Sequence, residues 1–523
     1  MNLLTDPLLR VQTKNELRLL NLPELLEALG RDEVEHLVGI QRHQEDAFHV
    51  FLCYVAGAVL SRHGSEDPVQ DQDFWRQGLR SLAGGAGDDA WRLVVDDLAR
   101  PAFMQPPLPP GDHDKLKVKA LTPDALDLLV TSKNHDVKQS RAIHAHPDTW
   151  VYALVSVQTM DGFAGQGNRG ISRMNSGYGN RSVVELIRTR RLGGRWRDAV
   201  VRLLNHRRCV LDGPYGYDPQ GLVLVWTEAW DGQSSLPLSR LDPFYVEICR
   251  RIRLRGTGDT VLRADFLSST ADRIAAKELR GIVGDAWLPV DVGPVGGKET
   301  EEKALTVSPA GLTPELLRRL VFEDGLVLTP LQKPLSDWRG DLWLHVSVLV
   351  RGQGITEGFH EIEIPIPLKA QRRLFSRTEE DRKALAALAR SATEIAGQMQ
   401  NRVLKPAVFT YFEGAPEKLS FDRESAQAWW TRFERRFVSL WFEEYFPWLW
   451  SVPEEFDEDL ELHNWAIRIR DHALTVLREV EQSMPQHAGF PYRMRVRAEQ
   501  RFWGSLYAVF PSLKEVAYER SAR

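Results

Sequence analysis

Cysteine is scarce in this sequence, and the few positions it occupies exclude two kinds of site. Only three cysteines, Cys53, Cys209 and Cys249, are spread over 523 residues. A disulfide framework needs many paired cysteines, and a structural zinc or iron–sulfur site needs CxxC-like spacing, so neither is expected. Sparse, unpaired cysteine is typical of proteins from a reducing compartment, and we expect a cytoplasmic protein.

Long apolar runs are also missing. The uncharged run from Val50 to Leu60 is about half of the roughly 20 residues that a membrane-spanning helix requires. The N-terminal sequence MNLLTDPLLR lacks the basic start and long apolar stretch of a signal peptide. The sequence therefore predicts a soluble protein without a membrane partner. At about 150 residues per domain, its length corresponds to roughly three structural units.

Catalytic motifs are absent as well. The chain contains no HExxH zinc motif and no GxSxG nucleophile elbow. The segment from Gly293 to Lys298 is not a phosphate-binding loop, because Val292 occupies the place of its first glycine. Glu299 likewise replaces the hydroxyl residue that would hold magnesium. We therefore expect no cofactor and no catalytic residue.

A polar loop over residues 132–147 carries the one cluster that suggests metal chemistry. It contains His135, Asp136, His144 and His146, but their spacing matches no known metal-binding pattern. Polar loop residues are the favoured interpretation. A metal-dependent nuclease or hydrolase that uses these four side chains remains the alternative.

Arginine, in contrast, is concentrated in one part of the chain. Residues 169–208 include eleven arginines and only two acids, Glu185 and Asp198, although the whole chain has a net charge of −5. The planar guanidinium favours bidentate contacts with phosphate, and such clusters dominate affinity for nucleic acids. The excess predicts a phosphate-contacting surface. The alternative is a face that is balanced by acids elsewhere in the fold.

The order of the elements predicts an α+β protein with a change of character near residue 375. Residues 1–375 are expected to form a large mixed α/β body. It has a buried helix over 46–60, an extended connector with five prolines over 101–110 and a glycine-rich loop over 162–179. Residues 376–523 show four amphipathic helical patterns and predict a four-helix bundle. Pro406 is expected to end the first helix, and Pro447 with Pro453 to break the second.

A β-hairpin is the clearest strand signal. Residues 342–350 and 359–367 are both strand-like, and prolines at 365 and 367 restrict the second strand to a sheet edge. The residues between them, 351–358, include three glycines and predict a protruding tip that is too long for a tight two-residue turn.

Several of these features occur in the order found in one known family. They are the opening Asn2-Leu3-Leu4, the PAFMQ element at 101–105, the loop at Asn134 and His135, the Gly162-Phe163-Ala164-Gly165 loop, and the hairpin followed by a bundle. In this order the chain resembles the CasA family, the large subunits of the type I-E CRISPR surveillance complex Cascade. The resemblance covers nearly the whole chain. Some relatives carry paired cysteines for a zinc site, which this chain cannot build.

The resemblance implies recognition without catalysis. In such complexes a guide RNA held by other subunits pairs with the target, while the large subunit reads a short flanking motif, the PAM, in double-stranded DNA. It then helps to open the duplex for R-loop formation and offers a surface to an effector helicase–nuclease. The family reads the minor groove with a glycine loop, a lysine finger and a hairpin wedge.

The resemblance also assigns roles to residues of this chain. Those assigned to DNA recognition are Gly162 and Gly165 in the glycine loop, Lys277 as the lysine finger, and Thr356 and Glu357 at the wedge. Arg169, Arg173 and Arg181 are expected to contact DNA phosphates, and Asn134, His135 and Lys138 to dock on the guide RNA and the neighbouring backbone subunit. A large subunit of another type I CRISPR subtype is the second alternative, beside the metal-dependent enzyme.

Overall fold

The computed structural model describes residues 1–127, 145–175, 177, 179–293, 301–335, 338–352, 355–376, 379–414, 419–422, 424–483 and 491–514. The chain forms two compact units. Unit 1 comprises Met1–Thr313 and Glu323–Pro365, and unit 2 comprises Pro314–Phe322 and Ile366–Arg523. The predicted α+β class is confirmed, while the predicted boundary between residues 375 and 376 stays a prediction.

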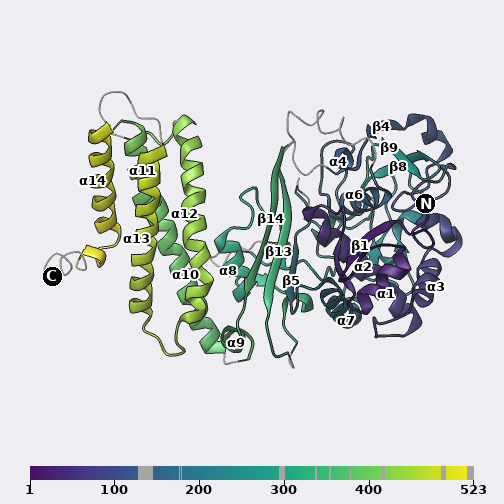
Figure 1. Cartoon of the computed structure of the whole chain (residues 1–523), viewed down its shortest axis with the longest axis horizontal. Helices are drawn as coiled ribbons and strands as arrows, with labels where there is room; N and C mark the ends of the chain where they lie inside the picture. Colours follow the sequence, from purple (N-terminus) through teal and green to yellow (C-terminus); the bar gives the residue numbers. More distant parts are fainter. Residues whose placement is uncertain are drawn as a thin grey trace. The chain divides into compact units, whose positions relative to one another are not determined.

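Unit 1 contains several small sheets and no single large one (Figure 1). Four of them have three strands each, and their strand pairs are antiparallel. In sheet order these are β2 (Leu17–Leu20), β1 (Leu9–Thr13) and β3 (Val34–Leu37); β4 (Lys117–Ala120), β9 (Thr260–Leu267) and β8 (Arg251–Thr257); β11 (Lys303–Ala304), β10 (Val290–Asp291) and β12 (Leu326–Val327); and β14 (Ile355–Pro365), β13 (Trp343–Gly352) and β5 (Val183–Ile187). The short β6 (Leu222–Leu224) and β7 (Leu241–Val246) form a parallel pair.

Helix α2 (Arg42–His63) is the central helix of unit 1. Its residues from 46 to 60 are all buried, which confirms the predicted buried helix. It packs against α3 (Gln72–Leu82), α6 (Pro147–Met160), α7 (Leu192–Leu211) and β7. The left-handed residue Gly64 (φ 65°) ends the helix, as is common at helix C-termini. The shorter helices of the unit are α1 (Leu22–Gly30) and α4 (Pro123–Leu126).

The proline-rich segment at 101–110 differs from the predicted extended connector. As expected it forms no strand, and no helix begins before Pro110. It is buried, however, and its turn is held by the side chain of Gln105, whose Nε2 donates to the carbonyl oxygens of Leu93 and Phe103 at 2.8 and 3.0 Å. Since a buried amide is costly unless it is hydrogen-bonded, this satisfied side chain makes the segment part of the core.

The predicted hairpin is confirmed, but its tip is shorter than predicted. Strands β13 and β14 stay paired out to Gly352 and Ile355, so only residues 353 and 354 lie between the paired ends. The expectation of a tip too long for a two-residue connection is therefore wrong. Strand pairing is made by backbone hydrogen bonds, which need no side chains, so a strand pair can continue through a glycine-rich sequence. Strand β14 lies at the edge of its sheet, as the two prolines predict.

Unit 2 is helical, and four long helical segments run side by side in it, as predicted (Figure 1). Pro406 does not end the first of these segments, because a π-helical stretch (Met399–Leu404) precedes it and accommodates a residue that cannot donate a backbone hydrogen bond. Pro447 lies inside the second helix, which continues to Ser451. The elements are α8 (Pro314–Phe322), α9 (Leu368–Gln371), α10 (Glu379–Gln398), α11 (Lys405–Phe412), α12 (Glu424–Ser451), α13 (Glu458–Ser483) and α14 (Pro491–Val509). No helix in the described ranges is both long and apolar enough to cross a membrane.

Candidate nucleic-acid interface

The glycine loop of unit 1 has a defined backbone in spite of its composition. It closes on itself where Gly162 N donates to Gly179 O at 3.0 Å and Phe163 N donates to Gly177 O at 2.8 Å. Its far end is a tight turn in which Asn168 N donates to Gly165 O at 3.0 Å. Backbone hydrogen bonds at the base of the loop and at its turn therefore hold the loop in a defined shape.

The two glycines assigned to this loop occupy different environments. A Cβ on Gly162 would overlap the carbonyl oxygens of Gly177 and Gly179, so glycine is required there for close backbone packing. Gly165 has φ 101°, a conformation that side-chain-bearing residues rarely adopt, and a Cβ on it would meet no atom within 4 Å. Gly165 thus faces open space at the turn, whereas Gly162 shapes the loop from within.

Lys277 lies beside this loop although it is far away in the sequence. A cavity of about 470 Å³ is lined by Gly162, Arg169 and Lys277, together with Arg280. Lys277 begins a single 3₁₀ turn (Lys277–Leu279) and is exposed. Within the described part of the chain it has no ion-pair partner. Three basic residues from two segments therefore border one hollow next to the glycine loop, together with the acidic residues Asp272 and Glu278, and Arg280 is paired with Glu301.

Arg280 is a basic residue of this cavity that the sequence analysis did not single out. It caps the 3₁₀ turn in the left-handed conformation, with φ 50° and ψ 37°, which is rare for a residue with a side chain. The next residue, Gly281, packs so closely on the backbone of Met174 and Asn175 that a Cβ would lie 2.7 and 2.9 Å from their atoms. An arginine–glycine step three residues after a candidate lysine is a signal that could have drawn attention to it.

The glycine loop and the hairpin are neighbours. Asn180 at the base of the loop donates its backbone N–H to Leu349 O on β13 at 3.0 Å. The chain then enters β5, which pairs with β13 from Val183 opposite Ser347 to Ile187 opposite Trp343. The loop thus leads directly into β5, and β5 and the hairpin belong to one sheet.

Thr356 and Glu357 lie in the backbone of β14. Thr356 pairs with Arg351, and the register then shifts so that Val350 pairs with Gly358. Glu357 is therefore the extra residue of a β-bulge, a feature that twists a strand and redirects its side chains. The side chains of residues 351–357 lie outside what the structure describes.

Two of the three arginines assigned to phosphate contacts are buried. Arg181 forms an ion pair with Asp285 at 2.5 Å, and Arg173 lies 3.9 Å from the ring centre of Tyr245 and donates to its carbonyl oxygen at 2.7 Å. Both side chains are at most 3% exposed. The expectation for these two residues is wrong, because a guanidinium that is enclosed and paired inside the unit cannot reach a phosphate outside it. Arg169 stays partly exposed beside the cavity and donates to Thr270 O.

The wider arginine stretch is also largely paired. Its charges are offset partly by the two acids of the segment itself and partly by acids elsewhere in the fold, which is the alternative stated for this segment. The pairs are Arg188–Asp198, Arg190–Glu363, Arg191–Asp32, Arg195–Asp46, Arg195–Glu185, Arg202–Asp198, Arg207–Asp242 and Arg208–Glu66. The described residues of 169–208 therefore do not form a continuous band of unpaired arginines, although several of these side chains remain exposed.

The residues assigned to guide-RNA docking lie outside the described residues. These are Asn134, His135 and Lys138, and the same holds for Asp136 and His144 of the alternative metal site. His146 is described and precedes the first residue of α6. Among the residues that the structure describes, no group of three His, Cys, Asp or Glu side chains could hold a metal ion.

Unit 1 contains a hydrogen-bonded glycine loop, a cavity beside it that Lys277 borders, and a long hairpin, and unit 2 is a helical bundle. These features define a class of large α+β proteins, and solved structures identify its fold as that of CasA, also called Cse1. The chain is similar to Thermus thermophilus CasA with a TM-score of 0.63 and 17% identity, over 97% of this chain and 99% of that one. It is similar to Cse1 from Acidimicrobium ferrooxidans with a TM-score of 0.58 and 14% identity, over 97% and 98% of the two chains.

A third similar structure was solved as a "CRISPR RNA-guided surveillance complex". It aligns with a TM-score of 0.51 and 12% identity over 98% of this chain and 99% of that one. No family model matches the sequence, and no curated protein matches it. The resemblance to CasA is therefore confirmed at the level of the fold.

Proposed function

We propose that this chain is the large subunit of a CRISPR RNA-guided surveillance complex and that it reads a PAM in double-stranded DNA. The observation that carries the proposal is the hydrogen bond from Asn180 N to Leu349 O. It places the glycine loop, with the open Gly165, beside the hairpin. The likeness to a chain solved as a CRISPR RNA-guided surveillance complex supports it.

The geometry suits a minor-groove reader. The groove is about 6 Å wide, so a turn without a side chain at Gly165 can approach base edges that a larger residue would not reach. Lys277, exposed at the neighbouring cavity, would supply a positive charge to an anionic groove. Arg169 would neutralise a nearby phosphate.

The hairpin would act as the wedge. Minor-groove wedge proteins separate a base step at a cost of a few kcal/mol, and a rigid element performs this better than a loose one. The paired strands β13 and β14 meet this requirement up to Gly352 and Ile355. Thr356 and Glu357, close to that end, are the residues we place nearest to the first base pair.

The remaining partners follow from the same proposal. Asn134, His135 and Lys138 would dock on the guide RNA and the adjacent backbone subunit, and a helicase–nuclease effector would act on the opened target. The subunit itself would perform no catalytic step, and the complex would work in the cytoplasm.

Co-purification tests the proposal. The chain is expressed with its neighbouring gene products, and a short guide RNA is expected in the purified assembly. That assembly should select particular flanks from target duplexes with a randomised flanking sequence. A monomeric chain without RNA that cleaves nucleic acid in the presence of Mg²⁺ or Mn²⁺ would instead support the metal-dependent enzyme.

A further inference from the structure

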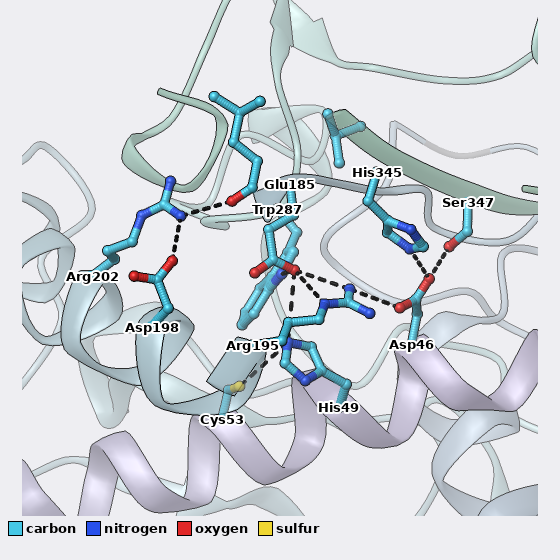
Figure 2. A network of polar contacts seen from close by, with 12 residues as sticks. Asp46, His49, Cys53, Glu185, Arg195, Asp198, Arg202, Trp287, His345 and Ser347 are labelled. Atoms are coloured by element: carbon cyan, nitrogen blue, oxygen red, sulfur yellow. Dashed lines mark hydrogen bonds and ion pairs between the residues drawn. The ribbon is translucent and has the colours of Figure 1, made fainter. Parts of the chain in front are cut away.

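A cluster of buried charges lies at the root of the hairpin (Figure 2). Asp46 of α2 is its centre. Two residues of β13 donate to Asp46 Oδ2: His345 through Nε2 at 2.7 Å, and Ser347 through its hydroxyl. On the other side of the carboxylate, Arg195 Nη2 of α7 lies 2.8 Å from Asp46 Oδ1. Arg195 also donates to Glu185 Oε2 of β5 at 2.9 Å. One carboxylate thus ties the hairpin strand to two helices of the body.

Neighbouring charges shift the pKa values of His345 and Asp46. Burial alone would lower the pKa of His345, but the charge of Asp46 outweighs it and raises that pKa to about 9. Burial opposes ionisation of Asp46 too, yet His345 and Arg195 hold its pKa well below its usual range. Arg195 lies between Asp46 and Glu185, and His345 lies between Asp46 and Glu363, whose Oε1 is 3.7 Å from His345 Nδ1.

The cluster continues to the glycine loop. Trp287 donates its indole N–H to Glu185 Oε2 at 3.4 Å, and its backbone N–H to Asp285 Oδ1 at 2.9 Å. Asp285 in turn is paired with Arg181, which directly follows Asn180 at the base of the loop. A continuous line of buried polar contacts therefore connects the base of the glycine loop to strand β13.

Stability alone does not account for such a cluster. Withdrawing charges from water is costly, and well-packed apolar residues in place of a buried ion pair are often as stable or more stable. What directional, charge-assisted bonds supply in addition is one defined orientation of the groups that they join. Here the groups joined are the hairpin strand, β5, α2 and α7.

We propose that this cluster fixes the root of the hairpin in the orientation that duplex opening requires, with Asp46 as its positioning residue. The inference rests on the proposed function, since it presumes that the hairpin is the wedge. A wedge transmits force to a base step only if its root does not turn, so a loosened root would reduce opening without altering flank selection at Gly165.

The test uses the assembled complex and two targets. One is a fully paired duplex with the flank that the unmodified complex prefers, and the other has its first few pairs mismatched in advance. Asp46→Asn keeps the shape of the side chain and removes its charge. We expect R-loop formation to slow about tenfold on the paired target, equal to about 1.4 kcal/mol, and to stay near normal on the mismatched one.

Asp242→Asn is the matched control. Asp242 is equally buried and pairs with another arginine of α7, Arg207, at 2.5 Å, but it lies on β7 and not at the hairpin. Melting of the isolated chains shows whether the two variants are destabilised alike. Ser347→Ala, which removes one hydrogen bond and no charge, repeats the test with less disturbance and decides it if Asp46→Asn does not fold.

The outcomes separate the two proposals. Equal slowing on both targets, or the same selective slowing by Asp242→Asn, overturns the positioning role. If the unmodified complex selects no flank, the proposed function fails. If a shortened hairpin tip is selectively slow on the paired target and the Asp46 and Ser347 variants are not, only the positioning role fails.

Discussion

His345 Nε2 and Asp46 Oδ2 lie 2.7 Å apart although the two residues are separated by 299 positions in the sequence. Both side chains are buried, and the contact joins the hairpin strand β13 to the central helix α2. A histidine held in this way by a carboxylate stays protonated above neutral pH. The pair therefore makes the stability of unit 1 depend on pH within a definite window.

Replacing His345 by Gln should remove that dependence. The pKa of His345 rises from 6.5 to about 9 on folding, so its contribution is fully present below pH 6.5 and is lost as the pH rises through 9. The unfolding free energy of the wild type should fall by up to roughly 1 kcal/mol per pH unit over this window, relative to His345→Gln. Denaturant unfolding of both proteins at several pH values measures it.

His49 and Cys53, which lie in the same cluster, do not titrate in this window. Burial and the charge of Arg195 hold the pKa of His49 well below 6.5, and burial raises the pKa of Cys53 well above 9.0. The difference between the two proteins is therefore assigned to His345. Parallel curves for wild type and variant between pH 6.5 and 9 would show that the histidine is not protonated in the folded state.

Arg181→Ala should lower the stability of the chain, whereas Lys277→Ala should weaken duplex binding. Removing Arg181 leaves Asp285 buried without its ion-pair partner, which typically costs about 3–5 kcal/mol of stability. Lys277 is exposed, so its replacement should leave the unfolding free energy almost unchanged. It should instead weaken duplex binding by the complex and reduce the slope of log K against log salt by about 1.

Unfolding curves and a salt titration of duplex binding check this pair of variants. A Lys277→Ala complex with an unaltered salt slope would place the DNA elsewhere. An Arg181→Ala chain as stable as the wild type would mean that Asp285 finds another partner or becomes protonated.

Local patterns in the sequence predicted the elements whose cause is local. The apolar residues of 46–60 predict a buried helix wherever that helix packs, and the prolines at 365 and 367 exclude a central strand whatever the neighbours are. The arginine-rich stretch shows the opposite case. The net charge of residues 169–208 does not include the acids that pair with Arg190, Arg191 and Arg208. These acids lie at positions 363, 32 and 66.

The candidate site was predictable only in parts. Gly165 and Lys277 could be proposed from the resemblance, but the cavity that brings Lys277 beside the glycine loop depends on packing at Gly281. Likewise, Pro406 stays within a helical segment because a π-helical stretch precedes it. The first relationship joins segments about 100 residues apart that meet only in the folded chain, whereas the second is local but has no residue pattern that marks a π-helical stretch.

Gly165→Asp should abolish flank-dependent binding by the complex and leave its assembly intact. The side chain would project into open space at the turn, and its charge would be repelled by an anionic groove. Gly162→Ala is the contrasting variant, because its methyl group would displace the backbone at Gly177 and Gly179 and distort the whole loop. Binding to a randomised-flank duplex library measures the first effect, and guide-RNA content measures assembly.

The two glycine variants should also differ in the melting temperature of the isolated chain. The isolated Gly165→Asp chain should melt below the wild type, because φ 101° strains any residue with a side chain, and Gly162→Ala should melt lower still, because its methyl group overlaps two backbone carbonyls. If Gly165→Asp still enriches the same flanks as the wild type, the glycine at the turn does not face the DNA.

Shortening the hairpin tests the wedge directly. Val350 and Gly358 are paired, so residues 351–357 can be replaced by Asn-Gly, a dipeptide that favours two-residue hairpin turns, without altering the register below. The shortened wedge would no longer reach the first base pair, so it could not offset the few kcal/mol needed to unstack that pair. R-loop formation should be weak on fully paired DNA and near normal where the first pairs are already mismatched. A structural turn would instead give either no change or an equal loss on both targets, and that result would remove the hairpin from the opening step.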